Sequence, residues 1–289
     1  MPTIELTSGT IAYETVGPDI GPPVVFVHGV LVDHRLWSAV AERLAEHGIR
    51  SYLPTLPLGA HRIPWGPGAD RSPRGAARLI DAARLIDEFV SALDLHSATL
   101  VANDTGGALT QFALDANPEL VERVLFTNCD AFDLFPPQPF RTLFRLLSHP
   151  ALLRVGAALM RPRWIRHSPL GVGLLVRHPD PAFTASVFRP IQTDPAIRED
   201  LATFLGHIDP AELAAVTARM TRIRRPVSVV WGSADRCFTP EHGRRFAAVF
   251  DQSTFTEVAG ARTFVSLDDP AAVSDAIIDL AGRSVSGAA

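Results

Sequence analysis

The stretch that decides the fold is residues 100–108, which read Leu100-Val101-Ala102-Asn103-Asp104-Thr105-Gly106-Gly107-Ala108. An apolar run passes directly into a glycine-rich segment, so we expect a buried strand to turn sharply into a helix. Such a turn needs small neighbours around the residue that projects from the end of the sheet, and here that residue is Asp104. A second interpretation makes Asp104 an ordinary N-cap of the following helix. The stretch alone leaves both interpretations open.

Strands and helices alternate on both sides of this stretch. Alternating polarity over residues 4–7 and 11–16 predicts an opening hairpin. Continuous apolar runs, typical of strands buried on both faces, cover residues 24–27, 98–102, 124–127 and 227–231. Helical spacing of apolar residues covers 36–47 and 73–94. This order predicts an α/β protein whose central sheet is mostly parallel and flanked by helices.

The alternation stops after Asp130 and resumes at Val227. Residues 133–220 contain no convincing strand, and prolines divide them into short helical pieces. We therefore predict a core built from residues 1–132 and 221–289, with residues 133–220 inserted as a helical lid. A last helix over residues 270–281 is expected to complete the core.

The composition excludes several classes of protein. The formal net charge is −4, which offers no electrostatic attraction for nucleic acid or for an anionic membrane. Two cysteines, Cys129 and Cys237, are too few for a disulfide framework, and no metal-ligand spacing occurs. No signal-like N-terminus and no membrane-spanning apolar stretch is present. We expect a cytoplasmic monomer or homodimer that binds a small molecule and needs no cofactor or metal.

Two further motifs stand at the ends of predicted strands. Phe26-Val27-His28-Gly29-Val30 is a strand that ends in His-Gly, and Val230-Trp231-Gly232-Ser233-Ala234-Asp235 is a strand that ends in a loop acid. With the stretch around Asp104, these motifs resemble the α/β-hydrolase superfamily in order and in placement. An aspartate at the nucleophile elbow is most similar to the branch that contains haloalkane dehalogenases and epoxide hydrolases.

The resemblance implies a role for each matching residue. Asp104 would be the nucleophile that attacks an sp³ carbon and forms an ester intermediate. The backbone N–H groups of Val30 and Thr105 would form the anion hole. Asp235 would orient a histidine, and Asp130 is a second candidate for that acid. For Asp130, a loop carboxylate in solvent is an equally good interpretation.

Three other residues near these motifs have competing interpretations. His28 is expected to hold its loop through hydrogen bonds rather than to act in catalysis. His34 is a candidate pocket residue, although the start of a helix is its more frequent place. Trp164 in the predicted lid is a candidate pocket residue too, with simple packing as the alternative.

The residue expected to activate water is missing. The family has a histidine after the last strand, and the matching segment here reads Gly260-Ala261-Arg262-Thr263-Phe264, with Thr263 at the histidine's place. Without a general base, typically worth about 10²–10⁴-fold in rate, an ester on Asp104 should accumulate. The accessory residues of the branch are missing as well, since both tyrosines lie outside the predicted lid and Thr105 follows Asp104 where dehalogenases often have tryptophan.

Three hypotheses about function therefore stay open. The first is a hydrolase of a small, fairly apolar substrate whose base is a displaced lid histidine, with His149, His167, His178 and His207 as candidates. The second is a non-hydrolytic enzyme in which Asp104 acts as general acid or base, as in an isomerase or lyase. The third is a binder that has lost its chemistry. Retention of the aspartates and of the elbow glycines favours an enzyme.

Overall fold

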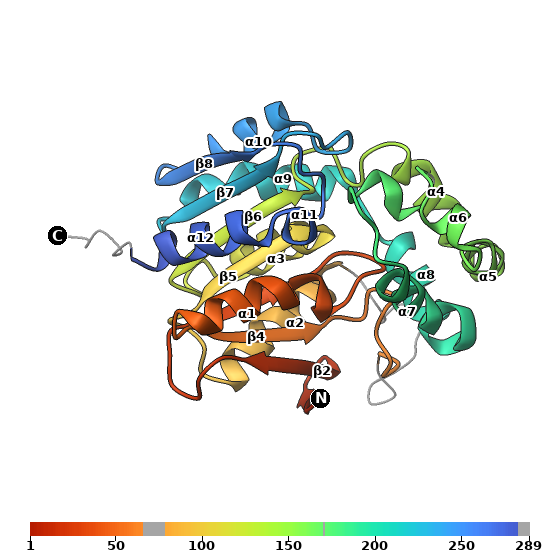
Figure 1. The fold of residues 1–289 in the computed structure, drawn as a ribbon, viewed down its shortest axis with the longest axis horizontal. Coiled ribbons are helices and arrows are strands. Elements are labelled where there is room, and N and C mark those ends of the chain that lie inside the picture. Colours follow the sequence, from red (N-terminus) through yellow and green to blue (C-terminus); the bar gives the residue numbers. More distant parts are fainter. Residues whose placement is uncertain (66–78, 170, 283–289) are drawn as a thin grey trace.

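The computed structural model describes residues 1–65, 79–169 and 171–282. Its centre is an eight-stranded sheet of order β1-β2-β4-β3-β5-β6-β7-β8, antiparallel at β1, β2 and β4 and parallel from β4 through β3 to β8 (Figure 1). The strands are β1 (Thr3–Leu6), β2 (Gly9–Val16), β3 (Pro23–Val27), β4 (Arg50–Thr55), β5 (Thr99–Asp104), β6 (Arg123–Cys129), β7 (Val227–Gly232) and β8 (Ser253–Val258). The predicted fold class is confirmed.

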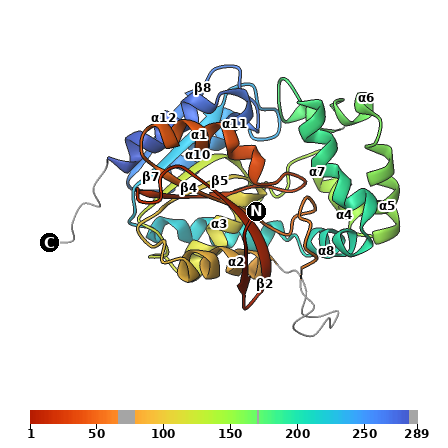
Figure 2. The ribbon, with the colours of Figure 1, turned by 60° about the horizontal axis from the view of Figure 1, so that its bottom comes forward.

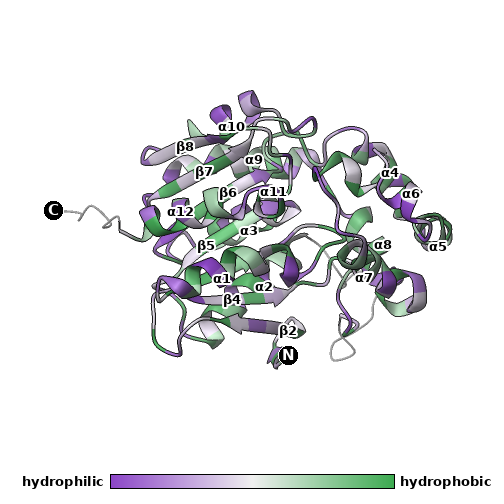
Figure 3. Cartoon of the chain, in the orientation of Figure 1, coloured by the Kyte–Doolittle hydropathy of each residue, from purple (hydrophilic) through white to green (hydrophobic). Residues whose placement is uncertain are grey.

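Helices cover both faces of the sheet because the strands are apolar on both sides. Helix α1 (Ser38–Glu46), preceded by the short helix η1 (His34–Trp37), packs with α12 (Pro270–Ala281) on one face. Helices α2 (Leu79–Ala92), α3 (Thr105–Ala116) and α9 (Pro210–Arg219) pack on the other. Successive residues of β3 alternate between these two layers, so Val25 and Val27 belong to one hydrophobic cluster and Val24 and Phe26 to the other. Green bands along the inner strands in Figure 3 mark this apolar interior.

Most predicted elements occur where the sequence placed them. The opening hairpin, the four apolar runs and the last helix match β1–β2, β3, β5, β6, β7 and α12. The predicted helix over 36–47 is divided into η1 and α1. Of the predicted helix over 73–94, residues 73–78 lie outside the described residues and the rest forms α2.

The insertion after β6 is helical, as the prolines predict. It contains α4 (Phe140–Leu147), α5 (Pro150–Leu159), α6 (Arg163–Arg166), η2 (Val172–Leu174), α7 (Pro181–Thr193) and α8 (Pro195–Gly206). Prolines begin α5, α7 and α8, where a missing N–H costs no hydrogen bond. Figure 2 shows these helices gathered at one end of the molecule (Figure 2).

The end of the insertion differs from the predicted boundary at residue 220. Helix α9 packs on α3 of the core, and Asp115 of α3 binds Arg219 at 2.7 Å and Arg222 at 2.6 Å. The helices that stand away from the sheet therefore end with α8, and α9 leads the chain back into the core. No helix in the described ranges is long and apolar enough to cross a bilayer.

Candidate active site

Asp104 occupies a strained turn between β5 and α3. Its backbone has φ 53° and ψ −132°, a region that residues other than glycine seldom adopt. Asp104 stands at the N-cap position of α3, but its side chain makes no capping hydrogen bond to that helix, so the geometry favours the elbow interpretation. Close packing explains the neighbouring glycines: a Cβ on Gly29 would lie 2.2 Å from Asp104 Oδ2, and one on Gly106 would lie 2.6 Å from the Val27 carbonyl oxygen.

The carboxylate of Asp104 lies at the two N–H groups that the sequence picked out. The backbone N–H groups of Val30 and Thr105 lie close enough to the carboxylate to lower its pKa, but among the described residues neither is within hydrogen-bond geometry of it. Burial raises the pKa of Asp104 to about 7, and the nearby charge of Asp235 acts in the same direction, while the two N–H donors oppose the shift. Near neutral pH this carboxyl therefore exists in both protonated and ionised forms.

Asp235, whose charge acts on Asp104, accepts three hydrogen bonds. Its Oδ1 accepts from the N–H of Cys237 at 2.7 Å and of Phe238 at 3.1 Å, and its Oδ2 accepts from Asn128 Nδ2 at 2.7 Å. Burial nevertheless raises the pKa of Asp235 to about 6. Asn128 is itself oriented, because its Oδ1 accepts from Gly232 N at 2.7 Å. The sequence did not identify Asn128 as a site residue, because a single polar residue near the end of an apolar strand gives no specific signal.

Thr263 is fully buried next to Asp235. Its hydroxyl is near enough to lower the pKa of Asp235 but lies outside hydrogen-bond geometry, since Oγ1 has no hydrogen-bond partner among the described residues. The Thr263 carbonyl oxygen accepts from Asn103 Nδ2 at 2.8 Å, which fixes the loop to β5. Asn103 thus has a positioning role that the sequence did not reveal.

Asp130 is fully buried beneath the elbow, so the interpretation as a loop carboxylate in solvent is wrong. Its Oδ2 accepts from Thr105 Oγ1 at 3.1 Å, and its Oδ1 has no partner among the described residues. Burial, reinforced by the charge of Asp104, raises the pKa of Asp130 well above its usual range. Asp130 does not line the cavity described next.

A cavity of about 180 Å³ lies between the elbow and the insertion, and its wall is almost entirely hydrocarbon. Asp104 is the one carboxyl that the described residues contribute to that wall, and Cys237 supplies a thiol whose pKa burial raises. The apolar lining includes Val30, Leu31, Val32, Phe140, Leu143, Phe144, Leu147, Leu153, Leu159, Met160, Val172, Leu175, Phe188, Ile191, Phe238 and Phe264. No histidine, tryptophan or asparagine of the described residues is part of it.

The histidines predicted as displaced bases lie elsewhere. His149, His178 and His207 are exposed on the insertion, and His167 Nε2 lies 2.8 Å from Thr184 Oγ1. None of the four contributes to the described wall of the cavity. The hypothesis of a displaced histidine base therefore receives no support from the geometry.

The remaining predicted residues also fall outside the cavity wall. His28 holds its loop, as expected: Nδ1 donates to the Gly29 carbonyl at 2.8 Å, and Nε2 accepts from Leu56 N at 2.8 Å. His34 lies 2.8 Å from Thr55 Oγ1 and 3.4 Å from Glu14. Trp164 is 76% exposed. His34 and Trp164 are thus not pocket residues in this structure, because one is bound to strand side chains and the other faces outwards.

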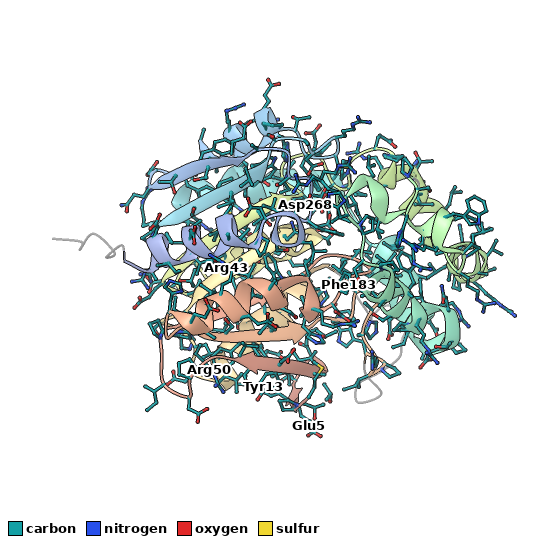
Figure 4. All side chains as sticks on the ribbon, in the orientation of Figure 1. Glu5, Tyr13, Arg43, Arg50, Phe183 and Asp268 are labelled. Atoms are coloured by element: carbon teal, nitrogen blue, oxygen red, sulfur yellow. The ribbon has the colours of Figure 1, made fainter. Side chains whose placement is uncertain are left out.

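The segment around Thr263 also connects the core to the insertion. Arg262 Nη1 donates to the carbonyl of Gly173 at 2.6 Å, and Phe264 N donates to that of Leu175 at 2.9 Å. Asp268 accepts from Arg262 N at 2.8 Å and from Arg177 N at 2.9 Å. Figure 4 labels Asp268 on the core side of this junction (Figure 4). In this protein the loop around Thr263, where the resemblance would place a histidine base, fixes the position of η2.

The class of this protein is defined by a mostly parallel sheet, an aspartate at the elbow after β5 with two backbone N–H groups near its carboxylate, and a helical insertion above it. The family model described as the alpha/beta hydrolase family matches residues 24–276. The chain belongs to the alpha/beta hydrolase family.

The most similar relatives point to the same branch as the sequence motifs. A haloalkane dehalogenase of Mesorhizobium japonicum is 25% identical over 288 residues, covering 95% of this chain and 88% of the relative. Haloalkane dehalogenase 2 of Mycobacterium tuberculosis is 24% identical over 285 residues, covering 95% and 92%. A crystal structure of a putative ancestral haloalkane dehalogenase superposes with a TM-score of 0.76 at 21% identity, covering 98% of this chain and 100% of that one. The chain is thus related to the dehalogenase-like branch, at a distance that leaves its reaction open.

Proposed function

We propose that this protein is an enzyme that acts on a small, largely apolar molecule bound under the helical insertion, and that Asp104 moves a proton to or from it. The observation that carries the proposal is that Asp104, with a pKa of about 7, is the one carboxyl among the described residues of a wall that is otherwise apolar apart from the Cys237 thiol. A general acid or base is most effective when its pKa lies near the working pH.

The surroundings of Asp104 favour proton transfer over hydrolysis. Completing a hydrolysis needs a base beside the ester, and Thr263, which has no acid–base function, occupies that position. A leaving halide would need N–H donors from side chains, and neither tryptophan nor asparagine is in the described wall. An isomerisation can use one carboxyl alone, because an ionised Asp104 takes a proton from one carbon and, once protonated, returns it to another. The N–H groups of Val30 and Thr105 lie beside this carboxyl.

The test follows deuterium from solvent into candidate substrates. The protein is incubated in D₂O with a panel of small apolar ketones, enones and secondary alcohols, and incorporation or isomerisation is followed by NMR and mass spectrometry. We expect catalysed exchange in at least one compound and its loss, by 100-fold or more, in Asp104→Asn. Exchange that survives in Asp104→Asn, or that is absent from the whole panel, would contradict the proposal.

A second candidate function keeps Asp104 as a nucleophile. The strained elbow and the two N–H groups at the carboxylate favour it, as do the relatives named as dehalogenases. In that case one equivalent of an alkyl halide or epoxide would leave a stable ester on Asp104. Intact-protein mass spectrometry distinguishes the two functions, since a persistent mass increase that is lost in Asp104→Asn supports the nucleophile and contradicts proton transfer.

A further inference from the structure

Charge is distributed very unevenly along this chain. Residues 134–179 contain seven arginines and three histidines but no aspartate or glutamate. The rest of the chain carries a formal charge of −11, so the small net charge of −4 conceals a basic segment. This acid-free segment spans α4, α5, α6 and η2 of the insertion.

The outward side of the same helices exposes large apolar side chains. The most exposed ones among the described residues of this segment are Leu146, Leu152, Val155, Leu159 and Trp164, at 44–76% of their surface. On α5, Leu152, Val155 and Leu159 follow helical spacing, while Leu153 and Ala157 on the opposite side are buried. Exposed apolar residues that cluster in this way are typical of an interaction surface.

Four exposed arginines, Arg145, Arg154, Arg161 and Arg163, alternate along the chain with these apolar residues. Within the described ranges none of the four has an ion-pair partner, whereas exposed arginines of the core such as Arg219, Arg224 and Arg244 are paired with carboxylates. We call these four arginines and the five apolar residues the outer face. Figures 1 and 2 both place its helices together at one end of the molecule, and in Figure 3 α5 is mainly hydrophobic and α6 hydrophilic.

We propose that the outer face docks on the surface of an anionic lipid bilayer. Leucine and tryptophan on a helical surface insert into the interfacial region of a bilayer, and arginines beside them attract acidic headgroups. A protein partner would have to be acidic and apolar at once, whereas a bilayer with anionic lipids offers both properties over any area. The expectation from net charge alone, that no membrane is bound, does not hold for a surface on which charge of one sign is concentrated.

The outer face lies next to the cavity, so docking on a bilayer would bring the cavity wall to the membrane. Leu159, the last residue of α5, is 55% exposed and also belongs to the cavity wall. Leu147 at the end of α4 and Met160 directly after α5 line the cavity as well. An apolar molecule dissolved in a bilayer would therefore meet the cavity wall at the docked face. This last step rests on the proposed function, while docking itself does not require Asp104.

The experiment is co-sedimentation of the full chain with vesicles of phosphatidylcholine alone or with 30% phosphatidylglycerol. We expect binding to the anionic vesicles that is at least tenfold stronger than to the neutral ones and that weakens with salt. Trp164 supplies a second readout, since the fluorescence of an exposed indole shifts to shorter wavelength on entering the interface. The shift should be absent in Trp164→Phe.

Two sets of variants make the test specific. Changing Arg145, Arg154, Arg161 and Arg163 together to glutamine should weaken binding at least thirtyfold. The matched control changes Arg84, Arg219, Arg224 and Arg244 of the core to glutamine. It removes the same number of positive charges and should leave vesicle binding within threefold of the wild type. Asp104→Asn should bind like the wild type, so a failed activity test would not count against docking.

Two results would overturn the inference. The first is the absence of binding to anionic vesicles at low salt. The second is a dimer, measured by analytical ultracentrifugation, that dissociates in Trp164→Ser while vesicle binding is absent, since the outer face would then join two copies of this chain.

Discussion

At the scale of single residues, the chemistry of this protein depends on a few buried carboxyls. Asp104, Asp235 and Asp130 all have raised pKa values, and burial is the first cause for each. Thr263 stands where the resemblance places a histidine, so Asp235 has no imidazolium at that position to lower its pKa. The site therefore favours protonated carboxyls at a pH where most aspartates are ionised.

The pH dependence of stability should reveal the raised pKa of Asp104. The folded state binds more protons than the unfolded state between the ordinary value of 3.8 and about 7, so stability falls as the pH rises through that window. The cost above both values is of the order of 4 kcal/mol. Urea unfolding should show Asp104→Asn more stable than the wild type at pH 8, with the gain vanishing at pH 4.

Asp115→Asn is the control for that measurement. Hydrogen bonding to Arg219 lowers the pKa of Asp115, so this carboxylate stabilises the fold above its ordinary pKa. Its replacement should destabilise the protein at pH 8 and have less effect at acid pH, the reverse of Asp104→Asn. Two variants with the same pH profile would contradict the assignment of the shift to Asp104.

Thr263→His tests the second candidate function, in which Asp104 is a nucleophile, because it should supply the base that hydrolysis lacks. The new imidazole would stand beside Asp235, which is already held by Asn128 and by two backbone N–H groups. We expect at least tenfold more halide to be released from alkyl halides than by the wild type, because general-base help is worth about 10²–10⁴-fold. Ion chromatography of halide measures this.

Two further variants control for the Thr263→His experiment. Thr263→Val removes the hydroxyl without adding a base and should not release more halide. The double variant Asp104→Asn/Thr263→His should lose any gain. Turnover that persists in the double variant would show that Asp104 is not the reacting group.

At the scale of elements, the site depends on the close approach of the loop after β3 to the turn between β5 and α3. Gly29 packs against the Asp104 side chain with no room for a Cβ. Gly29→Ala should displace the carboxylate from the Val30 N–H and reduce solvent exchange at least 100-fold, since misplacement by about 1 Å is that costly. Gly206→Ala, whose Cβ would meet only Ser148 at 3.6 Å, should keep full activity.

The strands also show what sequence patterns detect and what they miss. β3, β5, β6 and β7 are continuous apolar runs because both of their faces are covered, and the sequence located all four. β4 was not predicted, since Arg50 and Pro54 interrupt its pattern, and Pro54 is tolerated beside the antiparallel partner β2. β8 lies at the edge of the sheet and four of its six residues are polar, so no apolar run marks it.

The site itself was partly predictable for the same physical reasons. Asp104, Asp235, Val30 and Thr105 stand at the ends of strands, and parallel strands bring such ends together. Burial of Asp130 could not be predicted, because the insertion and α9 cover it from far along the chain. Absence of histidine from the cavity wall likewise depends on which way each insertion helix faces.

At the scale of the whole molecule, we expect the cavity between core and insertion to discriminate between ligands by their charge as well as by their size. Among the described residues its wall has one carboxyl and no cation, so an anionic ligand would face Asp104 with no described group to neutralise it. Hexanol and hexanoate, which share a chain length, isolate this effect. At pH 8.5, where Asp104 is ionised, we expect calorimetry to show hexanol binding at least tenfold more tightly than hexanoate.

The difference between the two ligands should depend on Asp104 itself. At pH 5.5 protonation of Asp104 removes the repulsion, so the affinity of hexanoate should rise while that of hexanol stays nearly constant. In Asp104→Asn the affinity of hexanoate should keep only the pH dependence that protonation of hexanoate itself produces. Equal binding of both ligands at pH 8.5 would mean that the hydrocarbon wall alone decides affinity and that Asp104 does not face the bound molecule.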